Sequence, residues 1–185
     1  MRFQASLSRG NLRESAQRTT MKASDDLHDI PAPALEFAFD MHLTFAGRPI
    51  LGTYPKGRRN WAQIDGGTFE GPGISGIVLG GGSDWPLSLT ADMEYLEFDA
   101  RYMLRTHDGV HIYVQNRGTL WGTPAVRRRL RDDEPVDPAE YYHRSTPVFD
   151  APKDGAYAWL ARTMFVASGS RRHDNSAQIR VFKIL

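Results

Sequence analysis

The residues best suited to acid–base chemistry are an aspartate and a tryptophan at the end of a glycine-rich segment. Residues 66–85 read GGTFEGPGISGIVLGGGSDW and end in Asp84 and Trp85. A carboxylate beside a large aromatic ring at the rim of a cavity loses solvation, which raises its pKa and lets it exchange protons near neutral pH. The alternative is structural, with Asp84 capping a turn and Trp85 closing the end of a barrel.

The glycines before Asp84 favour a structural role. Glycine at this density lets backbones approach each other or a ligand closely. A phosphate-binding loop would need a GxxxxGK[ST] motif, or a strand, glycine and helix context with an acid ~20 residues further on, and the sequence shows neither. Tight turns at the corners of a barrel are therefore the favoured interpretation.

Two further pairs of polar residues lie in strand-like segments. Asp99 and Arg101 are two residues apart and share a face, so they could orient a carbonyl or carboxylate ligand, although an ion pair is the commoner outcome. Tyr141 and Tyr142 are adjacent, so one of them must face the other way. A phenol inside a cavity is a usable acid or hydrogen-bond donor.

The histidines and an arginine run give weaker signals. His107 and His111 span a hairpin turn, where their spacing does not suit a shared metal, and His143 is isolated in a strand. Residues 127–131 hold four arginines that could contact phosphate. The acidic residues that follow neutralise them, which favours a solvated loop.

The residue types that are missing restrict the chemistry further. The chain has no cysteine, which excludes disulfides, thiolate nucleophiles, thiolate zinc sites and iron–sulfur clusters. It also has no GxSxG or HExxH motif. The sequence therefore predicts neither a metal nor a cofactor, and leaves carboxylate, phenol, amide and guanidinium groups to do the chemistry.

The charges divide unevenly along the chain. Of 23 basic and 22 acidic residues, residues 1–24 hold five basic and one acidic, which leaves 18 basic and 21 acidic in residues 25–185. The first segment lacks the apolar core of a secretory signal. We predict a disordered leader over residues 1–30 and one domain over 31–185, with a transit peptide or an upstream extension before Met21 as alternatives.

The same observations bound the partners. The charge balance argues against nucleic acid, and no window reaches the ~18 consecutive apolar residues of a membrane span. We expect a small-molecule ligand and a cytoplasmic protein without a membrane partner. The sequence is compatible with a homo-oligomer but does not fix the oligomeric state.

The elements that must position these residues are strands. Apolar side chains alternate with polar ones from residue 35, and an Asp-Gly turn at 108–109 joins the two clearest strands. The polar stretch at 122–138 is interpreted as a short helix or mobile loop, and residues 151–162 as one or two helical turns. The predicted strand segments are 35–44, 58–71, 74–79, 93–106, 110–121, 141–149, 161–167 and 177–185.

Eight to ten strands joined mostly by short turns predict an all-β fold with little helix. Such strands avoid free edges by closing on themselves, so we expect an antiparallel up-and-down β-barrel rather than a sandwich. An eight-stranded barrel can be nearly filled by side chains or can hold one small ligand.

Four segments, in this order, resemble the DUF3237 family, also called UPF0311. They are GGTFEGPGISGIVLGGGSDW, FDARYMLRTHDGVHIYVQNRG, YYHRSTPVFDAP and AWLARTMFVASGSR, and the resemblance covers residues 33–185. It implies a compact antiparallel barrel, lipocalin-like in general shape, in a mostly uncharacterised family. Ser83 stands where the family commonly has alanine, and the arginine-rich insertion has no counterpart in the family pattern.

The polar positions that match the family pattern are too many to be explained by turns. They are Asp84, Arg101, Tyr102, Asn116, Tyr142 and Arg144. Arg101 and Tyr102 cannot both point inward from a regular strand, because adjacent residues face opposite sides. Tyr102 is favoured, since it shares its face with apolar Phe98 and Leu104.

These residues suggest a cofactor-independent enzyme that acts on a small apolar molecule, aromatic or polyketide-like, as an isomerase, cyclase or lyase. Asp84 would be the general acid or base, while Tyr142, Asn116 and an arginine hold an enolate or phenolate oxygen. The alternative is a lipocalin-like carrier of a small hydrophobic ligand. In either case the predicted ligand-binding residues are Trp85, Arg101, Tyr102, Ile112, Asn116 and Arg144.

Overall fold

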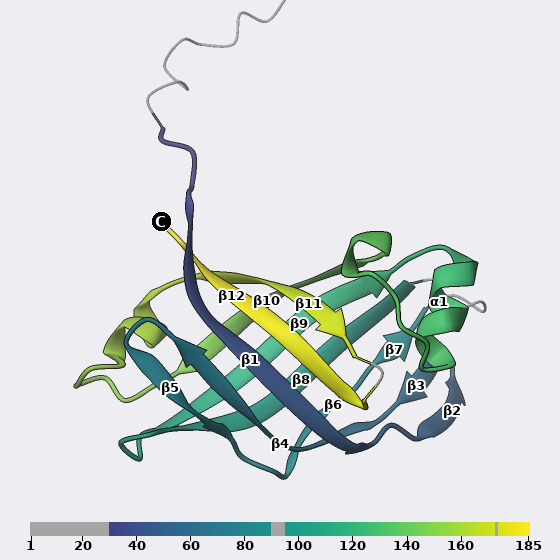
Figure 1. Ribbon diagram of the computed structural model, residues 1–185, viewed down its shortest axis with the longest axis horizontal. Helices are drawn as coiled ribbons and strands as arrows, with labels where there is room; N and C mark the ends of the chain where they lie inside the picture. The colour runs from purple at the N-terminus through teal and green to yellow at the C-terminus, as the bar shows by residue number, and fades with distance from the viewer. Residues whose placement is uncertain (1–29, 90–94, 173) are drawn as a thin grey trace, which may run out of the picture. The chain divides into compact units, whose positions relative to one another are not determined.

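A closed antiparallel β-barrel forms the folded part of the chain (Figure 1). The computed structural model describes residues 30–89, 95–172 and 174–185. In these ranges the strands are β1 (Leu35–Gly47), β2 (Ile50–Tyr54), β3 (Gly57–Asn60), β4 (Ala62–Gly71), β5 (Ile74–Val78), β6 (Gly82–Asp84), β7 (Leu87–Ser88), β8 (Tyr95–Thr106), β9 (His111–Trp121), β10 (Tyr142–Asp150), β11 (Phe165–Arg171) and β12 (Ser176–Ile184).

The barrel closes because its last long strand pairs with its first. The wall runs from β8 through β9, β10, β11, β12 and β1 to β4, and returns to β8 through β5 and β6. Since β5 and β6 occupy one position between β4 and β8, the wall has eight strand positions in the described residues. The hairpin of β2 and β3 lies outside this path and joins β8 through β7.

This architecture confirms the predicted barrel and locates the predicted strands to within a few residues. Residues 80–86 fall between the predicted strand segments 74–79 and 93–106, and the structure corrects this gap in the prediction. Gly82–Asp84 instead form β6, which pairs with β4 on one side and β8 on the other. Residues 1–29 of the predicted leader lie outside the described residues.

Large apolar side chains fill the barrel at the end away from α1 (Pro124–Arg131). The ring of Phe39 makes edge contacts with Phe69 at 5.9 Å and with Phe149 at 5.4 Å between ring centroids, and Phe149 contacts Phe165 at 5.0 Å. The short 3-10 helix η3 (Ala158–Arg162) adds Leu160 to this cluster. This half of the interior is therefore a packed core.

The helix α1 lies at the other end of the barrel, the same end at which β2, β3 and β7 are found (Figure 1). Its start is fixed by Pro124 in the first turn and by the Thr123 hydroxyl, which accepts the backbone N–H of Val126. Val126 and Leu130 pack on Leu120 and Tyr141. The predicted short helix at 122–138 thus occupies residues 124–131, and the 3-10 turn η2 (Pro138–Glu140) leads from it into β10.

None of the helices within the described ranges is long and apolar enough to cross a membrane.

Replacing Phe39 with alanine should strongly destabilise the barrel, because Phe39 is fully buried between Phe69 and Phe149. We expect a loss of about 3–5 kcal/mol in the free energy of unfolding, measured by urea denaturation. Val148→Ala is the matched control on the outer face, where the side chain is 65% exposed, and it should change stability by less than about 0.5 kcal/mol. Equal small losses would show that this end is not a packed core.

Candidate functional site

The half of the barrel nearer α1 contains a cavity of about 130 Å³. Apolar side chains form much of its wall, including Leu43, Ile64 and Phe98. Its size is close to that of a cavity that holds one benzene ring. The polar residues that line it are Arg48, Asn60, Asp84, Asn116, Arg127, His143 and Arg171.

Asp84 reaches this cavity because of its place in β6. It pairs with Ala62 of β4 on one side and Ala100 of β8 on the other. Ala100 pairs in turn with Asn116 of β9, so Asp84 and Asn116 lie in the same layer of the wall with one alanine between them. The methyl side chains of the alanines leave open space beside the carboxylate.

Asp84 as a whole is half-buried, and its carboxylate is not fully paired. Burial raises its pKa to about 7, against the backbone N–H groups of Trp85 and Asp99, which lower it. The positive charge of Arg48 also lowers the pKa of Asp84, by less than the two backbone hydrogen bonds do. Its Oδ1 atom is buried without a hydrogen-bond partner among the described residues. Asp84 can therefore both gain and lose a proton near neutral pH.

Asn116 and His143 present further polar atoms without partners in the described part of the chain. These are Oδ1 of Asn116 and Nδ1 of His143, and both side chains are buried. Burial, with the positive charges of Arg144 and Arg127, lowers the pKa of His143 to about 4, so the imidazole is neutral at physiological pH. Gly169 provides room for it, because a Cβ atom there would lie 2.4 Å from the ring.

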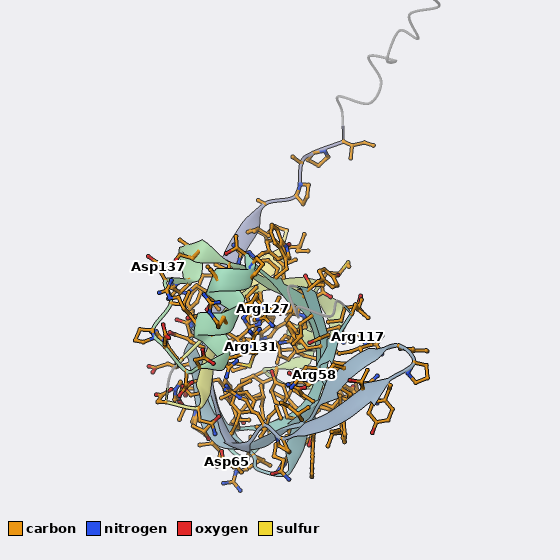
Figure 2. All side chains as sticks on the ribbon, turned by 90° about the vertical axis from the view of Figure 1, so that its right-hand side faces the viewer. Arg58, Asp65, Arg117, Arg127, Arg131 and Asp137 are labelled. Carbon is orange, nitrogen blue, oxygen red and sulfur yellow. The ribbon has the colours of Figure 1, made fainter. Side chains whose placement is uncertain are left out.

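Three arginines surround the α1 end of the cavity. Arg48 follows β1 and Arg171 ends β11, whereas Arg127 projects from α1 toward the barrel (Figure 2). Burial and the charge of Arg171 lower the pKa of Arg48 to about 10, and the same two causes followed by Arg131 lower that of Arg127 to about 10. An anion bound among these guanidinium groups would relieve their mutual repulsion, because a nearby opposite charge favours the charged form of each.

The structure brings together three of the predicted site residues. Asp84 and Asn116 line the cavity, and Tyr102 is buried in the packed core with its hydroxyl 3.6 Å from the Met41 sulfur. Burial raises the pKa of Tyr102 most, and the charge of Asp84 raises it further. A side-chain hydrogen bond with Asn116 lowers this pKa, but by less. Ile112 also points inward, but it is part of the packed core and does not line the cavity.

The remaining predicted residues lie on the outer face and do not reach the cavity. Tyr142 is 41% exposed, stacks on Trp121, and has the Arg144 guanidinium 5.2 Å above its ring. Alternation along β10 is the reason, since it turns His143 inward and both of its neighbours outward. The prediction that Tyr142 and Arg144 act with Asp84 inside the barrel is therefore wrong.

Arg101 and Trp85 also lie on the outer face. Arg101 pairs with the Asp99 carboxylate at 3.4 Å on the exposed face of β8. Trp85 is 42% exposed and stacks on Trp61, whose indole N–H donates to Ser83 at 2.9 Å. Ser83, the departure from the family pattern, thus supports an aromatic pair outside the barrel.

Sequence reasoning missed four cavity residues and misjudged one more. Arg48 and Asn60 lie in short turns or strands with no motif, while Arg171 is one of two adjacent arginines near a chain reversal. His143 was noted only as an isolated histidine, although its alternation with Tyr142 could have shown its direction. Arg127 was assigned to a solvated loop, yet it is 3% exposed.

Helical spacing could have identified Arg127. It follows Val126 on the buried side of α1, which also carries Leu130. Two of the acidic residues downstream pair instead with Arg129, which contacts Glu140 at 2.9 Å and Glu134 at 3.7 Å. Within the described ranges, no three His, Cys, Asp or Glu side chains are grouped as a metal site would require.

The sequence matches a known family. The family model described as "Protein of unknown function (DUF3237)" matches residues 33–184. The chain belongs to the DUF3237 family. Its similarity to the UPF0311 protein RPA1785 of Rhodopseudomonas palustris is 37% identity over 155 residues, which is 83% of this chain and 99% of that protein.

Solved structures of other proteins show the same barrel. The crystal structure of RPA1785 has a TM-score of 0.79 at 32% identity and covers 84% of this chain and all of the other. A β-barrel-like protein from Acinetobacter baumannii has a TM-score of 0.72 at 30% identity, over 85% and 99% of the two chains. An enzyme from Penicillium herquei, at 22% identity, shares the fold with a TM-score of 0.61 over 84% and 98%.

Asp84→Asn should change how the stability of this DUF3237 protein depends on pH. Because the pKa of Asp84 rises from 3.8 to about 7 on folding, the folded state binds more protons than the unfolded state between these values. The stability contributed by Asp84 is complete below about pH 4 and is lost as the pH rises to about 7. Three pKa units correspond to a loss of about 4 kcal/mol at most.

The asparagine variant lacks this loss, so its stability relative to the parent should increase between pH 4 and pH 7 and then stay constant. Urea unfolding at a series of pH values measures the difference. His143 titrates in the opposite direction between about pH 6.5 and 4 in both proteins and cancels in the comparison. A difference that does not vary with pH would show that Asp84 has an ordinary pKa.

Proposed function

We propose that this protein is a cofactor-independent enzyme that moves a proton on a small molecule bound in the barrel, as an isomerase, cyclase or lyase does. The observation that supports this proposal is the Asp84 carboxylate, which faces the cavity with one oxygen unpartnered and has a pKa near neutrality. A general acid or base is most effective when its pKa lies near the working pH.

The neighbours of Asp84 supply the second requirement of such a reaction. When a proton leaves carbon next to a carbonyl group, negative charge develops on the oxygen and must be stabilised. Arg48 lines the same cavity, its Nη1 atom has no partner in the described residues, and its charge lowers the pKa of Asp84. In this proposal Arg48 takes the role that the sequence gave to Arg101 or Arg144.

Apolar walls around Asp84 define the class of substrate. Ala62 and Ala100 flank the carboxylate, and Ile64 and Phe98 extend the apolar surface on either side. A ring or short carbon skeleton fits this surface, while its carbonyl oxygen faces Arg48. These contacts support an apolar substrate with a carbonyl or phenol group, in agreement with an aromatic or polyketide-like molecule.

A carrier of a small hydrophobic ligand is the second candidate, and the same apolar walls support it. Buried polar atoms without partners favour the enzyme over the carrier. Asp84 and Asn116 cannot stabilise a purely apolar ligand, and leaving their polar atoms unpaired beside it costs free energy. The Penicillium herquei protein is described as an enzyme, but at 22% identity it informs the fold alone. The proposal therefore depends on the cavity.

Asp84→Asn should reduce proton transfer without preventing ligand binding. We expect the parent to catalyse deuterium exchange into small cyclic and aryl ketones in D₂O, followed by NMR, and the variant to lower the rate about 10²- to 10⁴-fold. Native mass spectrometry of both purified proteins should show the same retained ligand, because the neutral amide keeps the shape of the cavity.

Asp150→Asn is the matched control, since Asp150 is exposed at the opposite end of β10 from His143. This variant should exchange deuterium at the parental rate. Equal exchange by the parent and Asp84→Asn would remove Asp84 from the mechanism. Ligand retention without any exchange or turnover in the parent would favour the carrier.

A further inference from the structure

We propose that the ligand of this cavity carries a second oxygen group, a hydroxyl or a carbonyl, which binds to His143 on the wall opposite Asp84. This inference rests on the proposed function for the other end of the molecule, where a carbonyl group lies beside Asp84. The contact with His143 is a separate property, because it requires only that one bound molecule span the cavity.

His143 presents a polar side chain to the cavity from an apolar part of the wall. The residue lines the cavity and is 8% exposed. Its ring makes an edge contact with Phe98 at 5.2 Å between ring centroids, and Leu120 is its pairing partner in β9. Its Nδ1 atom is buried without a hydrogen-bond partner in the described residues. A buried polar atom of this kind costs free energy until it is paired, and a ligand oxygen at this wall would pair it.

The neighbouring strand leaves a fixed place for the imidazole. β10 and β11 pair with Arg144 opposite Ser168, and His143 and Gly169 follow in the same register. A Cβ atom at Gly169 would lie 2.4 Å from both Nδ1 and Cε1 of the ring, which is too close for any side chain. Packed between this bare backbone and the Phe98 ring, the imidazole loses little conformational entropy when it binds a ligand.

The stagger of the strands decides which wall residues lie at one level. A row of paired residues that starts at Glu97 in β8 passes once round the wall and ends at His107, ten residues further along the chain. The residues between them in this row are Thr119, Arg144, Ser168, Arg180, Asp40, Glu70 and Ser75. Because the wall has eight strand positions, a row climbs by slightly more than one residue at each position.

This stagger places His143 and Asp84 at the same level. In the order β6, β8, β9 and β10, Asp84 lies one position before β8, in the row of Ala100. His143 lies two positions after β8, in the row of Leu96. The row of Leu96 starts four residues lower in β8, and the climb over the three positions from Asp84 to His143 offsets this by about four residues. The two side chains therefore lie on nearly opposite walls, and the interior of an eight-stranded barrel has room for one small ligand between them.

The charge state of the imidazole suits an uncharged oxygen group. Burial, followed by the positive charges of Arg144 and Arg127, lowers the pKa of His143 to about 4. At neutral pH the ring therefore has one N–H donor and one acceptor nitrogen, so it can pair with a hydroxyl or donate to a carbonyl. A hydroxyaryl ketone is the simplest molecule with both ends, because its carbonyl lies beside Asp84 while its hydroxyl reaches His143.

Two para-substituted acetophenones of nearly equal size test the inference, because one carries a hydroxyl where the other carries a methyl group. We expect calorimetry or NMR titration at about pH 6, where the phenol is un-ionised, to show that the parent binds para-hydroxyacetophenone more tightly than para-methylacetophenone. In His143→Phe the ratio of the two affinities should fall about 10- to 100-fold, because the hydroxyl is then buried without a partner. Binding of the methyl compound should stay unchanged.

Two further variants and a control separate hydrogen bonding from shape. His143→Gln keeps a donor and an acceptor and should restore part of the preference for the hydroxyl compound. Gly169→Ala keeps the histidine but displaces its ring, so it should lose the preference as His143→Phe does. His111→Phe, at an exposed position of β9, is the matched control and should bind both probes as the parent does. Circular dichroism and unchanged binding of the methyl compound show that each variant is folded with an intact cavity.

An equal or weaker affinity of the parent for the hydroxyl compound would overturn the inference, as would a ratio that His143→Phe leaves unchanged. If the ratio does not depend on His143 while deuterium exchange into para-methylacetophenone still depends on Asp84, the inference falls and the proposed function stands. If the preference depends on His143 but neither ketone exchanges deuterium, the contact stands and the acid–base reaction falls.

Discussion

Closure of the strand wall is the constraint on which the rest of the structure depends. The wall closes because β12 pairs with β1, and β8 pairs with both β5 and β6. Every second side chain of each wall strand therefore points into the interior. At one end that space is filled by interlocking phenyl rings. At the other end the same alternation directs Asp84, Asn116 and His143 into a space that is not filled. The candidate site is therefore a consequence of incomplete filling in a closed barrel.

The polar groups in that space oppose the stability of the fold. Desolvation raises the pKa of Asp84 and lowers the pKa values of His143 and Arg48, so it favours the neutral form of each. Six of the residues lining the cavity carry a buried polar atom that has no partner within the described ranges. Such groups cost free energy unless something binds to them. The packed core around Phe39 offsets that cost, which is why the chain can keep an unsatisfied cluster without a disulfide to support it.

The fold could be predicted from the sequence because it depends on a repeated signal. Alternation over long strands and the Asp-Gly turn at 108–109 are local, and each predicts the same barrel. The site was harder, because it depends on which face of each strand turns inward. Asp84 and Asn116 were identified correctly as facing a cavity, but Tyr142 and Arg144 were placed on the wrong face by one position in β10. Arg48 and Arg171 come together only through the pairing of β1, β12 and β11, which no local pattern reports.

The interior is divided into a packed end and an open end, so the residues that stabilise the fold are separate from the residues that bind the ligand. Residues such as Phe39 and Phe149 sit far from the arginines, so a change near α1 leaves the main source of stability intact. Most of the cavity wall comes from inward-facing side chains of the long strands, and a turn, a short strand and one helix add Arg48, Asn60 and Arg127. These side chains can vary without altering the backbone pairing of the long strands. A barrel built this way can acquire a new ligand by replacing a few residues at one end, and a laboratory library confined to those positions would sample different ligand specificities on an unchanged scaffold.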